Sequence, residues 1–366
     1  MKKNLVFFHP NIRDDGCKKT LEIYTDFLVN KFNVILVTNT PNKNFLKNIN
    51  SKVKIINLNN FFFNKIFILN ELFCLMSLIK FFNKNTIIFS LDGYLVLLIL
   101  KFLGTKFNLF VRIANPIPLE NNYKILSTNP GSEIGIIDLF FLKYSDVTIL
   151  YSDLYQNYLK RKYKVKNIII IKNYFKKTKV KVKKRNTNPN IFFVGRLTDI
   201  KDPIFFLKNL IKISKIIKIK IHFVGEGPLL ESLKKISKEN NVSVKFHGFI
   251  KRPFEKISKK IDLFCLTSKH DGTPNVLGEA ISKKIPCIAP KNVGCVNELM
   301  SNGRYGTLYQ KGDSADFRKK IKYVLNNHKE INLKAEKAFE ALDRYNLDNT
   351  LKKLEKKILT YFKNFY

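Results

Sequence analysis

The sequence predicts an α/β protein built from two Rossmann-like βαβ domains that face each other across a cleft. Short apolar runs alternate with longer helical patterns over the 366 residues, which is typical of βαβ units with parallel sheets. The apolar runs are continuous and rich in β-branched residues, as expected for strands covered by helices on both faces. A basic stretch near the middle interrupts the alternation, and the length accommodates two domains of roughly 150 residues each.

The first series of predicted strands fills the N-terminal half of the chain. Helical patterns separate most of these strands, for example at 17–31 and 153–162. The most apolar segment, 61–82, also carries Lys65 and Lys80. It has two open interpretations, a buried crossover helix of this domain or a segment that lies in a membrane interface. The strands are expected at 5–8, 34–38, 53–58, 86–90, 108–112, 147–151 and 167–171.

The composition changes between 172 and 185, where eight residues are basic and none is acidic. This stretch and the following Asn-Thr-Asn-Pro predict an exposed linker. The predicted domains are therefore 1–175 and 190–345, with the basic linker at 176–189 and a C-terminal helix in 346–366 that packs back on the first domain. The second domain should contain strands at 191–194, 218–224, 242–247, 263–266, 285–289 and 306–309, and helices near 203–214, 228–238, 275–283, 296–300, 315–326 and from 332 to 365.

The charge balance is strongly basic. Lys and Arg number 66 against 29 Asp and Glu, which gives a formal net charge of +37. Such a charge favours polyanionic partners, whether nucleic acid, an anionic membrane surface or phosphorylated metabolites. The alternative is compositional bias, since the chain is rich in Lys, Asn, Ile and Phe and has no Trp.

Cysteine usage and hydropathy indicate a cytoplasmic protein. The five cysteines are odd in number and show no CxxC spacing, which argues against a disulfide framework or a zinc site. The N-terminal apolar run is too short for a signal peptide. No uncharged apolar window of about 18 residues is present, so no transmembrane helix is expected. Peripheral association with the inner face of the cytoplasmic membrane stays open.

Nucleotide-binding motifs of two common kinds are absent. The only glycine before Asp92 is Gly16, so no GxGxxG follows the first strand and NAD or FAD binding is disfavoured. No GxxxxGK[ST] motif occurs either. Gly225 and Gly227 form a GxG at a strand–helix turn. They can serve a ligand or simply allow a tight turn before a helix that begins at a proline.

Two groups of residues in the second domain suggest an anion site. Gly195 and Arg196 end its first strand, and Lys201 follows where the next helix opens, so both cations can face one anionic group. Asp271 precedes a helix that starts near Pro274, and Glu279 lies about one turn inside it. Free amides at such a helix start favour phosphate. The alternatives are ordinary surface cations and Asp271 as a helix cap.

Taken together, the motifs of the second domain and their order along the chain resemble the C-terminal half of GT-B glycosyltransferases. The resemblance is specifically to glycosyltransferase family 4, of the kind that assembles bacterial surface glycans. The resemblance covers nearly all of 189–313, and the Glu-x7-Glu pattern of the family is kept with Asp271 in its first position. The matching blocks are VGRLTDIKD (194–202), IHFVGEGPLLESL (221–233), VKFHGFI (244–250), IDLFCLTSKHDGTPNVLGEAISKKIPCIAP (261–290) and GCVNELMSNGRYGTLYQKGD (294–313).

The resemblance implies roles for these residues. Arg196 and Lys201, beside Gly195, would hold the nucleotide diphosphate, and Glu279 the ribose hydroxyls. Asp271 would face the donor sugar with the turn that follows it, and the backbone near Phe249 and Ile250 would contact the base. The turn consists of Gly272, Thr273, Pro274, Asn275 and Val276.

The first domain resembles the family less closely. Family members place a glycine-rich loop after the first strand, where this chain has Gly16 alone. Many also carry a histidine after a central strand, where this chain has Arg112 and Asn115 and no histidine. These three residues are the acceptor-side candidates. Arg112 could equally be a structural cation, and His222 and His247 are expected to be structural.

The implied reaction is retaining transfer of a hexosyl or N-acetylhexosaminyl group from a UDP- or GDP-linked sugar to a hydroxyl of a glycan or lipid-linked acceptor. Cations and helix amides can stabilise the departing diphosphate, so neither a metal nor another cofactor is expected. Three alternatives stay open: a nucleotide-sugar epimerase of similar fold, a basic nucleic-acid-binding protein without a recognisable nucleic-acid motif, and a degenerate binding module.

Overall fold

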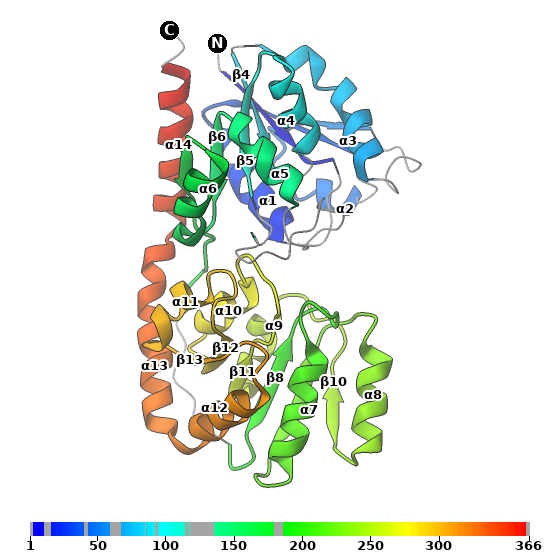
Figure 1. Cartoon of the computed structure of the whole chain (residues 1–366), viewed down its shortest axis with the longest axis vertical. Coiled ribbons are helices and arrows are strands. Elements are labelled where there is room, and N and C mark those ends of the chain that lie inside the picture. The colour runs from blue at the N-terminus through cyan, green and yellow to red at the C-terminus, as the bar shows by residue number, and fades with distance from the viewer. Residues whose placement is uncertain are drawn as a thin grey trace. The chain divides into compact units, whose positions relative to one another are not determined.

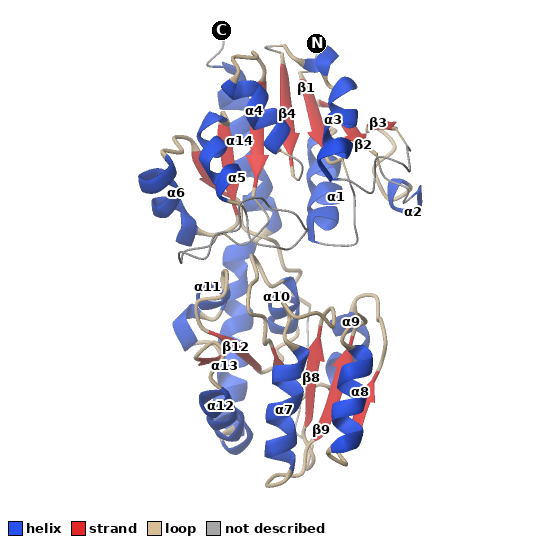
Figure 2. Ribbon diagram, turned by 45° about the vertical axis from the view of Figure 1, so that its right-hand side comes forward, coloured by secondary structure: helices blue, strands red, loops and turns tan. Residues whose placement is uncertain are grey.

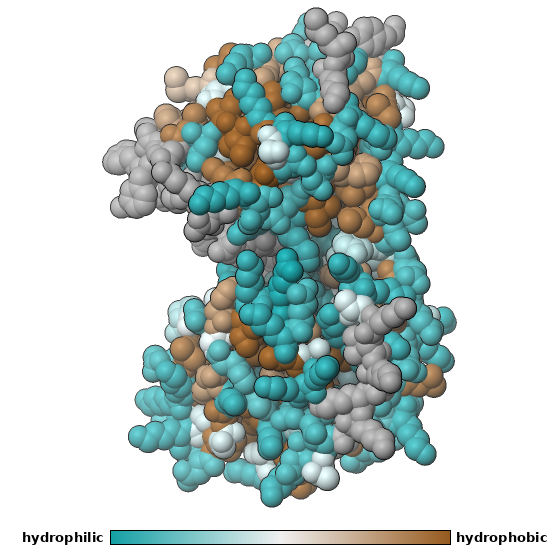
Figure 3. Space-filling model, turned by 180° about the vertical axis from the view of Figure 1, so that it is seen from behind, coloured by the Kyte–Doolittle hydropathy of each residue, from teal (hydrophilic) through white to brown (hydrophobic). Residues whose placement is uncertain are grey.

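The chain folds into two compact units, one formed by Met1–Asn173 with Leu347–Tyr366 and the other by Tyr174–Asn346. The structure is a computed structural model (Figure 1). It describes residues 3–10, 16–39, 43–58, 67–83, 85–91, 94–113, 117, 135–178 and 186–363. Figure 3 shows one side of the molecule, where hydrophilic side chains cover most of both units and apolar ones reach the surface in patches.

The N-terminal unit is built on a sheet of seven parallel strands in the order β3-β2-β1-β4-β5-β6-β7. β1 lies between β2 and β4, with Val6 paired to Ile35 on one side and Ile88 on the other. The strands are β1 (Asn4–Phe8), β2 (Asn33–Thr38), β3 (Lys54–Asn57), β4 (Thr86–Ser90), β5 (Asn108–Arg112), β6 (Val147–Leu150) and β7 (Ile168–Ile170).

Helices cover both faces of this sheet and create two apolar cores. Val6 and Phe8 point into one core, and Leu5 and Phe7 into the other, as the alternation of side chains along a strand requires. The first core is closed by α3 (Phe67–Met76), α4 (Leu95–Phe102), α5 (Ile136–Phe141) and α6 (Gln156–Tyr163), and the second by α1 (Gly16–Leu28), α2 (Lys43–Leu46) and α14 (Leu347–Lys363).

The last helix of the chain, α14, is part of the N-terminal unit. Its buried side chains Leu351, Leu354, Ile358 and Phe362 join the same core as α1. Glu355 on the same side of the helix accepts a charged hydrogen bond from Lys31 at 2.5 Å. The burial of one apolar stripe therefore anchors the end of the chain to its beginning.

The C-terminal unit repeats the design with six parallel strands in the order β10-β9-β8-β11-β12-β13. Its strands are β8 (Asn190–Val194), β9 (Lys220–Val224), β10 (Val244–Phe246), β11 (Leu263–Cys265), β12 (Cys287–Pro290) and β13 (Thr307–Tyr309). Its helices are α7 (Pro203–Ser214), α8 (Leu230–Glu239), α9 (Pro253–Ile257), α10 (Asn275–Ile281), α11 (Val296–Leu299), α12 (Ser314–Asn326) and α13 (His328–Ala341) (Figure 2). The predicted fold class, two Rossmann-like βαβ domains, is confirmed.

Several local predictions need correction. The segment 172–178 is not simply an exposed linker, because Phe175 is 4% exposed and packs in the core of the C-terminal unit. α8 begins at Leu230 rather than at Pro228, which lies in a turn. The helical pattern from 332 onwards is divided by a 3₁₀ turn, Leu342–Tyr345, into α13 and α14.

The apolar segment 61–82 lies partly outside the described residues, which resume at Phe67. In α3 the Cys74 side chain is buried against the sheet, and in the turn that follows Leu78 is buried as well. The described part of the segment is therefore a crossover helix between β3 and β4. Within the described parts of the chain, no helix has the length and apolar character needed to cross a bilayer.

His222 and His247 form a stacked pair on the second sheet. The His222 ring lies on the Phe192 ring at 4.3 Å between centroids, with 2° between the planes. Its Nδ1 is 3.1 Å from His247 Nε2, and its Nε2 is 3.0 Å from Asn190 Oδ1. Burial, followed by the neighbouring His247 and Lys245, lowers the pKa of His222 to about 4. These contacts support the structural interpretation of both histidines.

This pair predicts a loss of stability in acid. Unfolded histidine takes up a proton near its ordinary pKa of about 6.5, whereas folded His222 resists protonation down to about pH 4. The unfolded state therefore binds more protons in this window, and stability should fall as the pH drops. We expect His222→Gln to reduce the loss between pH 7 and pH 5 by about 1 kcal/mol in urea unfolding, since His222 is only half-buried. His328→Gln is the control, and an equal effect of both variants would contradict the prediction.

Candidate active site

The topology of the second sheet marks one position for a ligand. β8 and β11 are neighbours although β9 and β10 lie between them in sequence. The loops that follow these two strands therefore lead to helices on opposite faces. Open α/β sheets bind their ligands at such a point of the carboxyl edge, which we call the crevice. These are the loops 195–202 and 266–274, and they contain Arg196, Lys201 and Asp271.

The turns that leave β8, β9 and β10 are joined by backbone hydrogen bonds. Gly195 N donates to Val224 O at 2.9 Å, and Gly225 N donates to Gly248 O at 2.8 Å. Gly225 has φ +137°, and a Cβ there would lie 1.9 Å from the Gly195 carbonyl oxygen. The backbones can approach this closely only because Gly225 lacks a side chain. The first glycine of the GxG thus supports the tight-turn interpretation.

Lys201 and Asp271 meet at the crevice. Lys201 Nζ donates to Asp271 Oδ2 in a short, charged hydrogen bond. Their side chains are 20% and 13% exposed, so the pair is shielded but reachable from solvent. Ser268 Oγ lies 3.4 Å from the same carboxylate oxygen. The interpretation of Asp271 as a helix cap is wrong, because Pro274 is the N-cap residue of α10 and makes no side-chain cap bond.

Arg196 differs from Lys201 in its surroundings. Its side chain is exposed, and no hydrogen bond or ion pair joins its guanidinium to a residue that the structure describes. A guanidinium in this state is available for a bidentate bond to phosphate. The two cations therefore do not share one protein partner.

Side chains that the sequence did not single out fix the two loops against each other. Thr267 Oγ1 donates to the carbonyls of Lys201 and Asp202 at 2.9 and 3.1 Å. Asp202 has φ +50° and caps α7 through Phe205 N at 3.2 Å. Burial raises the pKa of Asp202, while Lys269, with its Nζ 3.8 Å from the carboxylate, opposes the shift. An Asp-Pro pair before an apolar run is a helix-start signal that could have identified Asp202.

The loop after β12 packs against the Asp271 turn. Cys295 N donates to Gly272 O at 3.0 Å. Gly294 has φ +51°, and a Cβ at this position would lie 2.0 Å from Gly272 O and 2.3 Å from Asp271 O. Burial raises the pKa of the Cys295 thiol to about 12. The thiol is therefore a packing group beside the site.

The remaining donor-side candidates lie on the turn 272–274 and on α10. Leu277 N donates to Pro274 O at 2.9 Å, so the amides of the first helical turn point out of the N-terminus, as in any α-helix. Asn275, Val276 and Glu279 are half-buried on this helix. α10 is also held in place at Gly278, where a Cβ would lie 2.3 Å from the Phe175 ring.

Phe249 and Ile250 follow β10 at the same edge. The Phe249 side chain is 71% exposed, and its backbone amide donates to Glu226 Oε1 at 3.2 Å. Ile250 packs against the core of the unit. Glu226, from the turn after β9, was not singled out from the sequence, and it holds the segment that the resemblance assigns to the base.

The three acceptor-side candidates belong to the N-terminal unit. Gly16 is the first residue of α1, and Asn115 lies outside the described residues. Arg112 is 3% exposed at the carboxyl end of β5, where its Nη2 donates to Asn173 Oδ1 at 2.7 Å. Its guanidinium carbon lies 5.9 Å from the centre of the Tyr24 ring. These contacts support the structural interpretation of Arg112.

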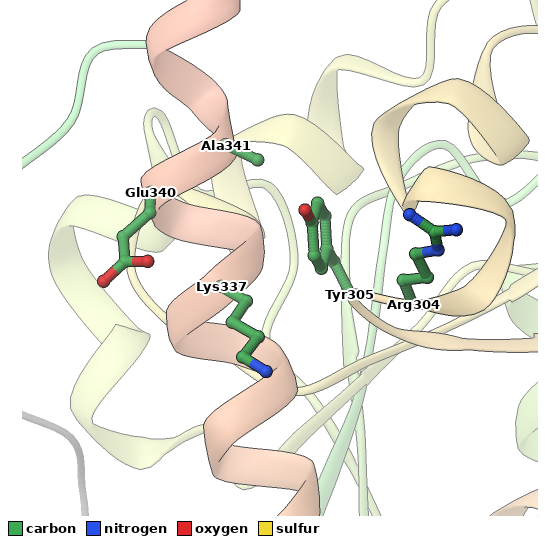
Figure 4. A pocket seen from close by; sticks show the side chains of 5 residues that line it. All are labelled: Arg304, Tyr305, Lys337, Glu340 and Ala341. Carbon is green, nitrogen blue, oxygen red and sulfur yellow. The ribbon is translucent and has the colours of Figure 1, made fainter.

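A pocket of the C-terminal unit lies between α13 and the segment before β13 (Figure 4). Its lining residues come from no loop that follows a strand of the sheet, whereas ligands of open α/β sheets bind at such loops. The carboxyl edge near β8 and β11 therefore stays the candidate active site. The pocket is lined by Arg304, Tyr305, Lys337, Glu340 and Ala341.

Comparison with known proteins finds a family match in this unit. The segment 188–327 matches the family described as Glycosyl transferases group 1. We call this segment the group 1 domain, after the family that it matches. It contains every residue of the crevice described above, so the residues that resemble the family in sequence are brought together at one edge of the sheet.

Relatives of the group 1 domain occur in glycan assembly. The chain is 29% identical over 147 residues to the "Lipopolysaccharide 1,6-galactosyltransferase" of Escherichia coli K12, over 38% of this chain and 40% of that protein. It is 28% identical over 139 residues to the Campylobacter jejuni "GalNAc-alpha-(1->4)-GalNAc-alpha-(1->3)-diNAcBac-PP-undecaprenol alpha-1,4-N-acetyl-D-galactosaminyltransferase", over 37% and 38%. The chain thus matches about two fifths of the length of these curated relatives.

Similarity of fold extends beyond the group 1 domain. The structure of Anabaena Alr3699/HepE in complex with UDP superposes with a TM-score of 0.75 at 16% identity, over 98% of this chain and 100% of that one. At this identity the likeness concerns the fold, and it includes both Rossmann-like units.

Proposed function

We propose that the protein is a retaining glycosyltransferase that moves a sugar from a nucleotide-diphosphate sugar to an acceptor hydroxyl. The observation that carries the proposal is the Lys201–Asp271 pair at the carboxyl edge between β8 and β11, inside the group 1 domain. A cation for the diphosphate and a carboxylate for the sugar stand side by side there. Ligands of such sheets bind at this edge.

Each part of the donor has a proposed partner in the crevice. Arg196 and Lys201 hold the diphosphate, and the amides of the 272–276 segment add the partial positive charge of a helix start. Glu279 holds the ribose, Asp271 holds the sugar, and the backbone of Phe249 and Ile250 contacts the base. As the sugar–phosphate bond breaks, negative charge grows on the diphosphate, and fixed cations stabilise this charge.

Donor binding changes the partner of Lys201. In the structure its ammonium is neutralised by Asp271, and a diphosphate that enters the crevice competes with this carboxylate. Asp271 then becomes available to accept a hydrogen bond from a sugar hydroxyl. The exchange couples recognition of the phosphate to recognition of the sugar.

The proposed acceptor is a glycan or a lipid-linked glycan. The names of the relatives include a lipopolysaccharide galactosyltransferase and an enzyme of undecaprenyl-diphosphate-linked glycans, which supports this class of acceptor and a role in surface-glycan assembly. On the acceptor side, Gly16, Arg112 and Asn115 stay proposals.

A panel of nucleotide sugars tests the function. We expect one UDP- or GDP-linked sugar to raise the unfolding temperature of the protein by mass action, while polyphosphate of equal charge gives no preference for base or sugar. Incubation with that donor should give transfer only when an acceptor is added. Epimerised donor without acceptor would indicate an epimerase, and retention on DNA without any nucleotide preference would indicate a nucleic-acid-binding protein.

Glu279→Gln separates donor binding from the chemical step. The ribose that Glu279 is proposed to hold carries no developing charge, so its loss should raise KM for the donor about three- to tenfold and leave kcat nearly unchanged. Steady-state kinetics with varied donor measures both constants. The control is Glu231→Gln on α8, whose carboxylate is exposed and paired with Lys234. A fall in kcat with unchanged KM for Glu279→Gln would contradict the assignment.

A further inference from the structure

The C-terminal unit contains a pocket outside the crevice, between α13 and the turn that precedes β13 (Figure 4). Its volume is about 610 Å³, and pockets that hold small ligands span roughly 300–1,000 Å³. It shares no residue with the loops 195–202 and 266–274 of the candidate active site. We call it the α13 pocket, and its lining residues are Arg304, Tyr305, Lys337, Glu340 and Ala341.

Helix α13 forms one side of the α13 pocket. Lys337, Glu340 and Ala341 are three and four positions apart, which places them on the same side of a helix, while Ala338 and Leu342 are buried in the core. Lys337 and Glu340 both belong to the described part of the chain, and they form no ion pair with each other. Figure 4 shows their charged ends pointing in different directions. The exposed Lys337 ammonium is therefore not neutralised by Glu340.

The other side of the α13 pocket is a turn with a fixed backbone. The residues of this turn, Ser301–Gly303, have φ values of +48°, +52° and +92°. Met300 O accepts from Gly303 N at 3.0 Å and from Tyr305 N at 3.2 Å. Left-handed φ values are unfavourable for residues other than glycine. They persist where the surrounding structure holds them, often at ligand sites. Arg304 and Tyr305 thus follow a backbone that is held in one conformation.

Tyr305 supplies an aromatic surface in the α13 pocket. Its ring lies between α13 and Arg304 (Figure 4). The side chain is half-buried and packs against the core of the unit, so one part of it is fixed while the rest faces the pocket. The Arg304 side chain beside it is exposed.

Neighbouring cations have protein partners, unlike the two that line the α13 pocket. Lys334 Nζ lies 2.9 Å from Glu330 Oε1, and Arg344 donates to a backbone carbonyl at 2.5 Å. The charged ends of Arg304 and Lys337 form no hydrogen bond or ion pair with any residue in the ranges that the structure describes. The α13 pocket therefore offers two available cations, one from each of its sides, next to an aromatic ring.

From these observations we infer that the α13 pocket binds a small phosphomonoester that carries a ring, a sugar phosphate or a nucleoside monophosphate. Such a phosphate has a charge of about −2 near neutral pH, which two cations neutralise. Arg304 and Lys337 donate to its oxygens, and arginine can do so through two parallel bonds. The attached ring lies against the Tyr305 ring. The inference goes beyond the proposed function, because no residue of the crevice takes part.

Titration calorimetry of the full chain tests the inference with glucose 6-phosphate, adenosine monophosphate, inorganic phosphate and glucose. We expect one of the two phosphomonoesters to bind at least about threefold more tightly than inorganic phosphate, because only a ligand with a ring can use Tyr305. Glucose should not bind. The tighter of the two phosphomonoesters identifies the kind of ring. Equal affinity for inorganic phosphate, or no binding of either phosphomonoester, overturns the inference.

Two single variants locate the ligand. Arg304→Gln and Lys337→Gln each remove one charge from an exposed side chain, so the unfolding temperature should stay near that of the wild type. Each should weaken binding of the phosphomonoester about three- to tenfold. The matched control is Lys329→Gln, an exposed lysine of α13 that does not line the pocket. It should bind like the wild type. Equal weakening by the control would mean that net charge alone attracts the ligand, and the inference would be wrong.

Arg196→Ala separates the α13 pocket from the crevice. The variant lacks a cation that the proposed function assigns to the diphosphate, so it should weaken binding of UDP and leave binding of the phosphomonoester unchanged. Loss of phosphomonoester binding in Arg196→Ala, with binding kept in Arg304→Gln, would place the ligand in the crevice and overturn the inference. UDP and the phosphomonoester are titrated separately, so either proposal can fail alone.

Discussion

Replacing Lys201 or Arg196 with alanine should lower kcat/KM about 30- to 1,000-fold. This corresponds to a loss of about 2–4 kcal/mol in transition-state stabilisation, as expected when one preorganised partner of a developing charge is removed. The loss should include kcat, because the diphosphate carries more charge in the transition state than in the ground state. Initial rates of sugar transfer with varied donor measure it. Lys208→Ala, an exposed lysine on α7, is the control and should have no effect.

The two cations should differ in stability. Lys201→Ala leaves the Asp271 carboxylate, which is 13% exposed, without its cation, so it should also lower the free energy of unfolding by about 1 kcal/mol or more. Adding Asp271→Asn to the Lys201→Ala variant should restore stability but not activity. Arg196→Ala should leave stability unchanged, because its guanidinium has no partner among the described residues. If both single variants keep the wild-type kcat, the diphosphate is held elsewhere.

The strands and longer helices could be predicted from the sequence because local signals and burial agree. α7 runs from Pro203 to Ser214 as expected, since Pro203 marks its start and its apolar residues recur at helical spacing. β1 and β5 were found as short runs of apolar residues. Phe175 was missed because its burial is decided by Gly278, about a hundred positions later in the chain, and no local pattern carries that information.

For the candidate site, the sequence could identify the groups but not their partners. The approach of Lys201 to Asp271 depends on β8 and β11 being neighbours. The side chains that hold these loops in place were missed because they form hydrogen bonds with backbone atoms. Thr267 donates to two carbonyls of another loop, and Glu226 accepts from the Phe249 amide. Threonine and glutamate are common in loops, so residue type alone gives no signal for such a role.

The second large effect is expected at Gly294, which lies where the loop after β12 contacts the Asp271 turn. Alanine there must accept φ +51°, and its Cβ would overlap the carbonyl oxygens of Gly272 and Asp271, at 2.0 and 2.3 Å. Relief requires the Asp271 turn to shift from the position in which Asp271 meets Lys201. We expect Gly294→Ala to lower the free energy of unfolding by about 2–4 kcal/mol and to abolish detectable UDP binding, measured by urea unfolding and calorimetry.

The control for Gly294 isolates the steric contact from the strained backbone. Gly312 has φ +78° and nothing within 4 Å of a built Cβ. Gly312→Ala should therefore cost only the conformational penalty of a left-handed residue, about 1–2 kcal/mol, and keep UDP binding. The difference between the two variants is then the effect of displacing the Asp271 turn. Equal losses of stability with UDP binding retained in both would mean that this turn can move without consequence, and Asp271 would lose its proposed place beside the donor sugar.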